Sequence, residues 1–250
     1  MRPIRALLVF MIGAVVSLAL TYVLVIRPRV RAWGVDPTET DLPIPGDDLV
    51  PEATTIETRG VTIDGPVAKV WPYLVQMGFG RAGWYSYDAM DMKGQSAETI
   101  RPEFQHLAAG DIMPVGPAGG FAVKTVDFER ALVLYTDTEM VREQARDGEL
   151  EGKGDRTDSF PEFSASWAFF LKPTDDGKAR LIERFRIKTP GTAPATAVLG
   201  EVMGTGIVLM TRKQMLRIKE LVERPAESTA PVEPDLPIPT DTAPEPSLAG

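Results

Sequence analysis

A long uncharged run near the start of the chain limits its possible folds more than any other feature. Residues 6–26, ALLVFMIGAVVSLALTYVLVI, are 21 consecutive positions without a charged side chain. As an α-helix rising 1.5 Å per residue, the run would be about 31 Å long, which matches the hydrocarbon core of a bilayer. It therefore predicts a single-pass transmembrane helix inside an N-terminal anchor of residues 1–31.

Two alternatives compete with this anchor. A cleaved signal peptide has an apolar region of about 7–15 residues that ends at small residues. The one stretch of that kind, Ser17 to Ala19, lies inside the run. The length of the run therefore favours an uncleaved anchor, and a buried core helix would seldom be so uniformly apolar.

The charges that flank the run bear on its orientation. Arg2 and Arg5 precede it, whereas Arg27, Arg29 and Arg31 follow it. Cytoplasmic flanks of transmembrane helices carry the excess of Lys and Arg. The single extra arginine after the run favours a cytoplasmic domain.

The rest of the chain is acidic. Five of the 27 Lys and Arg flank the run, which leaves 22 against 35 Asp and Glu and a net charge of −13 for the remainder. Such a surface repels phosphate backbones, so the composition argues against nucleic acid binding. The five arginines beside the run remain able to contact lipid headgroups.

Composition also excludes several chemistries. The chain has no cysteine and one histidine, His106. Disulfides, thiolate metal sites, thiol nucleophiles and multi-histidine metal centres are therefore excluded, and a serine–histidine–acid triad would have to use His106. We expect no metal centre and no cofactor.

Beyond the anchor, composition divides the chain into three parts. Residues 32–53 are rich in Pro and Asp, which predicts an extended connector. Residues 54–224 carry the regular hydrophobic patterns of one folded domain. Residues 225–250 hold seven prolines, five acidic residues and no Lys or Arg, which predicts a disordered tail.

Within the domain, short runs rich in β-branched and aromatic residues predict six strands. Polar turns at residues 127–130 and 174–177 join neighbouring runs into hairpins. The predicted strands cover residues 54–63, 111–115, 121–127, 131–137, 164–173 and 178–188.

Two helical regions accompany the strands. A helix starts at Pro66, and Pro72 should divide it into two short pieces. The last element is an amphipathic helix that ends at Glu223, with Thr205 as a candidate N-cap. We expect it to lie against the concave face of a sheet. Its apolar stripe contains Val208, Thr211, Met215, Ile218 and Val222.

The order of strand, short helices, antiparallel strands and one long helix is an α+β plan. Five segments resemble the START-related, Bet v 1-like (SRPBCC) superfamily, which includes polyketide cyclases and lipid-transfer proteins: TTIETRGVTIDGPVAKVWPYLVQMG, GRAGWYSYD, WAFFLKP, ARLIERFRIKT and MTRKQMLRIKELVER. The resemblance covers about residues 33–223. It implies a helix-grip fold, in which a curved antiparallel sheet closes round the C-terminal helix with an apolar cavity between them.

The segment VWPYLVQMGFGRAGWYSYD, the most specific part of the resemblance, is unusually aromatic. Six of the 19 aromatic residues lie between Trp71 and Tyr87. The glycines of residues 78–83 spell G-x-G-x-x-G, but no strand precedes them and bulky residues follow, which favours a turn over a nucleotide-binding loop. Such a turn would direct Trp84 and Tyr85 toward a cavity.

One carboxylate stands out among the predicted strands. Alternation along residues 179–188 places Glu183 on the same face as Leu181, Phe185 and Ile187, opposite three arginines. If that face is internal, Glu183 is a buried acid that must be paired or protonated. A bulge would shift the register and expose it instead.

Eight residues are candidate ligand contacts. Core packing or a place in a solvated loop is the ordinary alternative for each of them. Asp88, Tyr135 and Glu183 would orient polar groups of a ligand. The apolar wall would consist of Trp84, Tyr85, Tyr87, Trp167 and Met210.

Three functions are compatible with these expectations. The first is a membrane-anchored protein that holds a small hydrophobic or amphipathic ligand in an internal cavity, as a carrier or sensor. The second is a cyclase- or aromatase-like enzyme that uses the same cavity with Asp88 or Glu183 as its acid or base. The third is a scaffold that displays the acidic tail to a protein partner.

Overall fold

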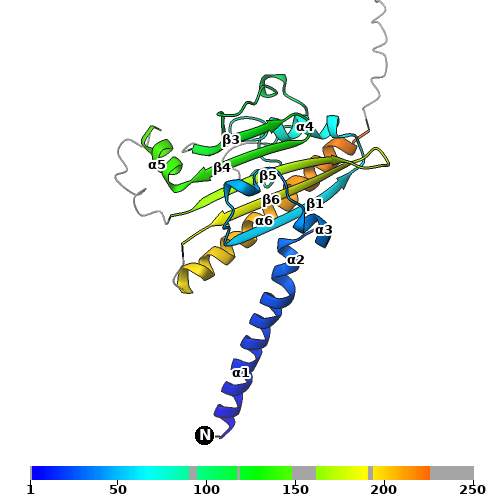
Figure 1. The fold of residues 1–250 in the computed structure, drawn as a ribbon. Helices are drawn as coiled ribbons and strands as arrows, with labels where there is room; N and C mark the ends of the chain where they lie inside the picture. Colours follow the sequence, from blue (N-terminus) through cyan, green and yellow to red (C-terminus); the bar gives the residue numbers. More distant parts are fainter. Residues whose placement is uncertain (1, 90–94, 117–118, 148–161, 191–193, 226–250) are drawn as a thin grey trace, which may run out of the picture.

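The structure is a computed structural model that describes residues 2–89, 95–116, 119–147, 162–190 and 194–225. It is an α+β fold in which a long C-terminal helix crosses one face of a six-stranded antiparallel sheet (Figure 1). The strand order is β1-β6-β5-β4-β3-β2, so the first and last strands in sequence are neighbours. The strands are β1 (Thr55–Ile63), β2 (Ile112–Gly116), β3 (Gly119–Asp127), β4 (Ala131–Asp137), β5 (Ser164–Pro173) and β6 (Ala179–Lys188).

These strands lie within one or two residues of the predicted ones, and the two predicted turns form hairpins. In the β3–β4 turn the Arg130 amide donates to the Asp127 carbonyl at 2.9 Å. In the β5–β6 turn Gly177 has a φ of +79°, a conformation that glycine adopts without strain. The hairpin turns are therefore encoded locally.

The helical elements differ more from expectation. The structure adds α5, which the sequence analysis did not anticipate, directly after β4; the Met140 amide there donates to Asp137 Oδ1 at 2.8 Å, so Asp137 caps its first turn. The helices are α1 (Arg2–Thr21), η1 (Tyr22–Ile26), α2 (Arg27–Arg31), α3 (Pro37–Asp41), η2 (Asp47–Leu49), α4 (Val67–Val75), η3 (Pro102–Phe104), α5 (Thr138–Asp147) and α6 (Pro194–Glu223).

Two helix predictions are corrected. α4 is one continuous helix although it contains Pro72. Pro72 removes a single amide donor from this short helix, and the burial of Val70, Trp71 and Leu74 holds both of its turns together. α6 begins at Pro194, so Thr205 lies inside the helix and does not cap it; proline is suited to the first position of a helix.

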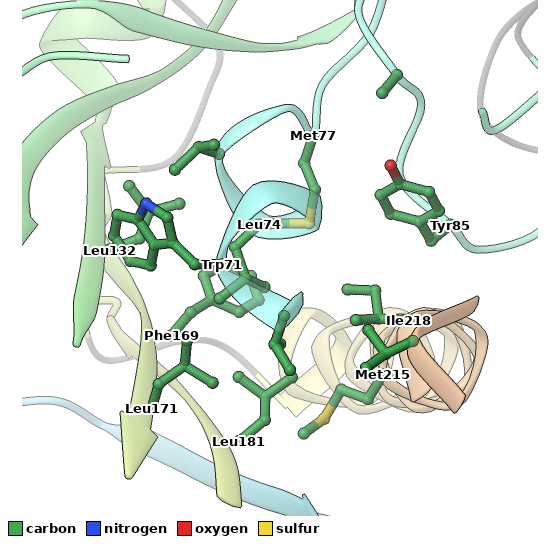
Figure 2. Close-up of a cluster of buried hydrophobic side chains, with 14 of the residues drawn as sticks. Trp71, Leu74, Met77, Tyr85, Leu132, Phe169, Leu171, Leu181, Met215 and Ile218 are labelled. Carbon is green, nitrogen blue, oxygen red and sulfur yellow. The ribbon is translucent and has the colours of Figure 1, made fainter. Parts of the chain in front are cut away.

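The core lies between the sheet and two helices, α4 and α6. Figure 2 shows Trp71, Leu74 and Met77 around α4 facing side chains of the sheet, with Met215 and Ile218 approaching from α6. All five are at most 5% exposed. Burial of large apolar side chains contributes about 1.5–3 kcal/mol each, so these two helices and the sheet stabilise one another.

The N-terminal helical stretch projects away from the domain (Figure 1). Phe10–Arg31 is long and apolar enough to cross a membrane, and its most apolar window has no buried residue. Leu18 and Leu24 are about 70% exposed. This apolar surface has no protein partner among the described residues.

The segment after the anchor packs on the face of the sheet opposite α6. We expected residues 32–53 to be extended, whereas the structure places α3 and η2 there. Asp36 and Glu39 form a capping box at the start of α3. Ile44 packs against Val133 of β4 and Ala168 of β5. Buried apolar contacts therefore fix this segment to the sheet.

Arginines of β6 complete the attachment. Arg180 forms an ion pair with Glu39 at 2.6 Å. Arg184, only 3% exposed, donates hydrogen bonds from all three guanidinium nitrogens. Its acceptors are the carbonyls of Glu39, Thr40 and Leu42, Asp47 Oδ2 and Thr58 Oγ1, at 2.7–3.1 Å.

We expect Arg184→Lys to destabilise the protein by about 2 kcal/mol, because lysine cannot reproduce the planar fork and leaves buried carbonyls unpaired. Thermal unfolding should show a melting temperature about 4–8 °C lower. The control is Arg130→Lys, whose side chain is 66% exposed in a surface pair; it should change stability by less than about 0.5 kcal/mol. Equal effects of the two substitutions would contradict the structural role of Arg184.

Candidate functional site

A cavity of about 210 Å³ lies between α6, the sheet and the loop that follows α4. It is somewhat larger than the cavity of about 150 Å³ that binds benzene in an engineered protein. Its lining is mainly apolar and combines three parts of the chain. The lining residues are Trp84, Ser86, Val115, Phe121, Trp167, Phe185, Ile207, Met210, Thr211 and Gln214.

An aromatic cluster centred on Trp167 forms one wall of the cavity. The Trp167 indole stacks on Trp84 with ring centroids 5.3 Å apart and an interplanar angle of 14°. Phe121 and Phe185 meet it edge-on at 5.7 and 6.3 Å. Offset stacking and edge-to-face contacts are the favoured geometries of aromatic pairs, so this wall is held in a defined shape.

The glycine-rich turn after α4 positions Trp84. Gly78 and Gly83 exchange two backbone hydrogen bonds at 3.1 and 3.2 Å, and both have positive φ. A Cβ on Gly83 would lie 2.8 Å from the Cα of Ser96, so the residue must remain glycine. The turn follows a helix rather than a strand, which agrees with a turn and not with a dinucleotide-binding loop. It brings Trp84 and Ser86 to the cavity.

One face of α6 forms the opposite wall. Ile207, Met210, Thr211 and Gln214 have the spacing i, i+3, i+4 and i+7, which places them on one helical stripe. Ser86 Oγ donates to the Met210 carbonyl at 3.0 Å and so ties the loop to α6. The loop after α4 is therefore hydrogen-bonded to α6 at the cavity.

Glu183 lies beside Trp167 but does not line the cavity. Its side chain has no exposed surface. Glu183 Oε1 accepts hydrogen bonds from Trp167 Nε1 at 2.7 Å and from Arg59 Nη1 at 3.2 Å. Arg59 is itself fully buried and also pairs with Glu57. The regular β1–β6 register, with Arg59 opposite Glu183, supports the buried alternative of the sequence analysis.

Arg59 thus forms ion pairs with two buried carboxylates, Glu57 and Glu183. Burial raises the pKa of Glu183 above its usual value, and Arg59 and the Trp167 indole oppose that increase only in part. Glu183 Oε2 has no partner among the described residues. The raised pKa favours the neutral form of Glu183, because an uncharged carboxyl costs less in a low dielectric than a buried carboxylate that its partners stabilise only in part.

Four other candidates lie outside the cavity lining. Tyr85 is fully buried, because its positive φ of 56° turns the ring into the core, where Gln76 donates to its hydroxyl. This burial raises the pKa of Tyr85 to about 12. Tyr87 is 44% exposed under Lys213. Asp88 is exposed, and its Oδ1 accepts from the Ser96 amide and hydroxyl at 3.1 and 2.9 Å.

Tyr135 lies on the outer face of the sheet. Strand alternation places it with Val133, while Leu132 and Leu134 face the core. Its hydroxyl donates to Asp137 Oδ2 at 3.0 Å. Of the eight candidates, the structure therefore brings Trp84, Trp167 and Met210 together at the cavity, with Glu183 behind Trp167.

The remaining lining residues were not among the candidates. Alternation along β6 could have identified Phe185, which shares the inward face with Glu183. The sequence could also have indicated Gln214, because it is a polar residue within the apolar stripe of α6, four positions before Ile218. Val115 lies at the bulge of β2 and Ser86 in the loop after α4, and only the tertiary structure sets the direction of these two side chains.

No family model matches the chain, and no curated protein matches it. Solved structures resemble it at low identity. A conserved protein from Geobacillus kaustophilus is 16% identical, with a TM-score of 0.35, over 67% of this chain and 95% of that one. A Mesorhizobium loti protein is 15% identical, with a TM-score of 0.37, over 69% and 99%. Ara h 8.0201 is 13% identical, with a TM-score of 0.23, over 64% and 98%.

The raised pKa of Glu183 predicts a particular pH dependence. A group whose pKa is higher in the folded state stabilises the fold below the unfolded value of 4.5, and this contribution is lost as the pH rises through the folded pKa. Wild type should therefore lose stability relative to Glu183→Gln as the pH rises above 4.5, by about 1.4 kcal/mol for each pH unit up to the folded pKa. Urea unfolding of both proteins from pH 4 to pH 8 measures this difference. If the wild type instead gains stability relative to Glu183→Gln over that range, the Glu183 carboxylate is ionised in the folded protein.

Proposed function

We propose that this protein is a membrane-anchored binding protein that holds a small hydrophobic or amphipathic molecule in the cavity beneath α6, as a carrier or sensor. The supporting observation is the cavity itself: about 210 Å³, walled by stacked aromatic rings and one face of a helix. A lined apolar cavity with a few polar groups is typical of a small-molecule site.

The lining favours binding over acid–base catalysis. None of the described residues that line the cavity carries a titratable side chain. Glu183 is not among the residues that line the cavity and is hydrogen-bonded to the edge of the Trp167 indole, and Asp88 is an exposed loop residue. A general acid or base must reach the reacting group within hydrogen-bond distance. The cyclase- or aromatase-like alternative therefore gains no support from either carboxylate.

The architecture fits a helix-grip domain, in which residues 54–224 form the binding unit and α6 closes it. Residues 1–31 would form the anchor, with the arginine excess favouring a cytoplasmic domain. Val115 and Ile207 line the cavity and are 47% and 37% exposed, so they form an apolar rim. Such a rim, on a domain tethered beside the bilayer, suits a molecule that is concentrated in the bilayer.

The third alternative, a scaffold that displays the acidic tail, concerns residues 226–250, which lie outside the described residues. The described residues that line the cavity all lie between Trp84 and Gln214. Ligand binding should therefore survive deletion of residues 225–250, whereas a scaffold would lose its protein partner in that truncation.

Filling the cavity should abolish binding. Thr211 lines the cavity and is 4% exposed, so Thr211→Phe places a ring in the space of the ligand. The control is Leu209→Phe, which adds the same ring two positions away at a residue that is 55% exposed and outside the lining. We expect the amount of co-purified small molecule to fall about tenfold or more in Thr211→Phe, which corresponds to about 1.4 kcal/mol of binding free energy, and to stay unchanged in Leu209→Phe.

The measurement uses full-length protein purified in lipid nanodiscs, followed by extraction and quantitative mass spectrometry. Empty nanodiscs supply the lipid background. Recovery of the same molecules at the same yield from wild type and Thr211→Phe would reject the cavity as the binding site. Recovery of nothing above background from wild type would reject the binding function.

A further inference from the structure

Three polar side chains line the otherwise apolar cavity, and all three are more than nine-tenths buried. Ser86, Thr211 and Gln214 are 8%, 4% and 2% exposed. Two of them have already used their only hydrogen. Ser86 Oγ donates to the Met210 carbonyl at 3.0 Å, and Thr211 Oγ1 donates to the Val208 carbonyl at 3.2 Å. Both hydroxyls are therefore left with acceptor capacity only.

Gln214 has an acceptor without a partner. Its Nε2 lies 3.3 Å from the sulfur of Met77. A thioether sulfur accepts hydrogen bonds and cannot donate them, so this contact fixes which end of the amide faces Met77. The opposite atom, Gln214 Oε1, is buried and has no hydrogen-bond partner among the described residues. Among the described residues that line the cavity, it is the only such atom.

A buried acceptor without a partner destabilises a protein, whereas a leucine of similar size at the same position would not. Oε1 is itself almost inaccessible, so a small rotation of the amide must turn it toward the cavity before a ligand can pair with it. A ligand that supplies a donor then removes this penalty, and a ligand without a donor retains it. The polar groups of the cavity thus discriminate between ligands by hydrogen-bond donation, while the aromatic wall and Met210 accommodate an apolar body.

We propose that the ligand is a small apolar molecule with a hydroxyl or N–H group, and that this group donates a hydrogen bond to Gln214 Oε1. The proposal rests on the proposed binding function and adds the chemical class of the ligand. It excludes a plain hydrocarbon and a molecule whose only polar atom is an ether or ester oxygen. The cavity volume of about 210 Å³ fits one ring with a short substituent, and the exposed rim allows a longer chain to protrude.

Three matched probes test this preference. 4-Ethylphenol carries a donor, 4-ethyltoluene replaces the hydroxyl by a methyl group, and 4-ethylanisole retains only an acceptor oxygen. Binding is followed in full-length protein in nanodiscs through the ¹³C-methyl signal of Met210, which lines the cavity. Met210→Leu identifies that signal. Comparison of protein variants in identical nanodiscs cancels the partition of each probe into lipid.

We expect Gln214→Leu to lower the affinity for 4-ethylphenol relative to 4-ethyltoluene about tenfold, the ratio that corresponds to one buried hydrogen bond. The affinity for 4-ethylanisole should not fall. Thr211→Val and Ser86→Ala remove the other two polar groups of the lining and should change the ratio less than twofold. The melting temperature of Gln214→Leu should equal or exceed that of wild type, because the unpaired acceptor is removed.

The outcomes separate this proposal from the binding function on which it rests. If all probes shift the Met210 signal of wild type but Gln214→Leu leaves the ratio unchanged, the role of Gln214 is wrong and the binding function stands. If Thr211→Val or Ser86→Ala lowers the ratio instead, the ligand donates its hydrogen bond to that hydroxyl and the assignment to Gln214 is overturned. If no probe shifts the Met210 signal of wild type, both proposals fail.

Discussion

The two-residue period of β6 is the constraint on which the rest of the structure depends. Successive side chains of a strand point to opposite faces, so Leu181, Glu183 and Phe185 face the core while Arg180, Arg184 and Arg186 face outward. A slip of one residue would bury three arginines and expose Phe185. The pairing of β6 with both β1 and β5 is continuous and without a bulge, which excludes that slip. The register of β6 therefore determines which face of the sheet each of its charged side chains lies on.

Each face of β6 organises a different part of the molecule. On the inner face, Glu183 holds the Trp167 indole, and Trp167 in turn stacks on Trp84, so the buried acid orients the aromatic wall of the cavity. On the outer face, the arginines bind the segment that follows the membrane-spanning candidate, and the Gly60 amide donates to the Trp33 carbonyl at 3.0 Å. β6 and its neighbour β1 thus connect the cavity with the segment that follows the N-terminal helix, which gives the proposed anchor a defined orientation relative to the proposed binding site.

The sheet could be predicted from the sequence because its signals are local: a period of two in the strands and polar turns between them. The short helices could not. α5 is mostly polar, and its start depends on Asp137; the packing of residues 32–53 depends on arginines more than 120 positions away. At the site, aromatic density and the α6 stripe indicated Trp84, Trp167 and Met210, whereas the positive φ of Tyr85 reverses its direction into the core. Gln214 gains significance only when its stripe is known to face a cavity. Whether any of these residues binds a ligand remains a prediction.

The central claim is that an apolar space between α6 and the sheet accepts a molecule from outside. Xenon tests it without any assumption about the ligand, because it is apolar, forms no hydrogen bonds and enters empty apolar cavities in crystals under pressure. A crystal of the full-length protein under xenon is therefore the most direct measurement. We expect a xenon atom within van der Waals contact of Trp84, Trp167 and Met210. A well-ordered crystal in which side chains fill this space, and xenon is absent from it, would contradict the account.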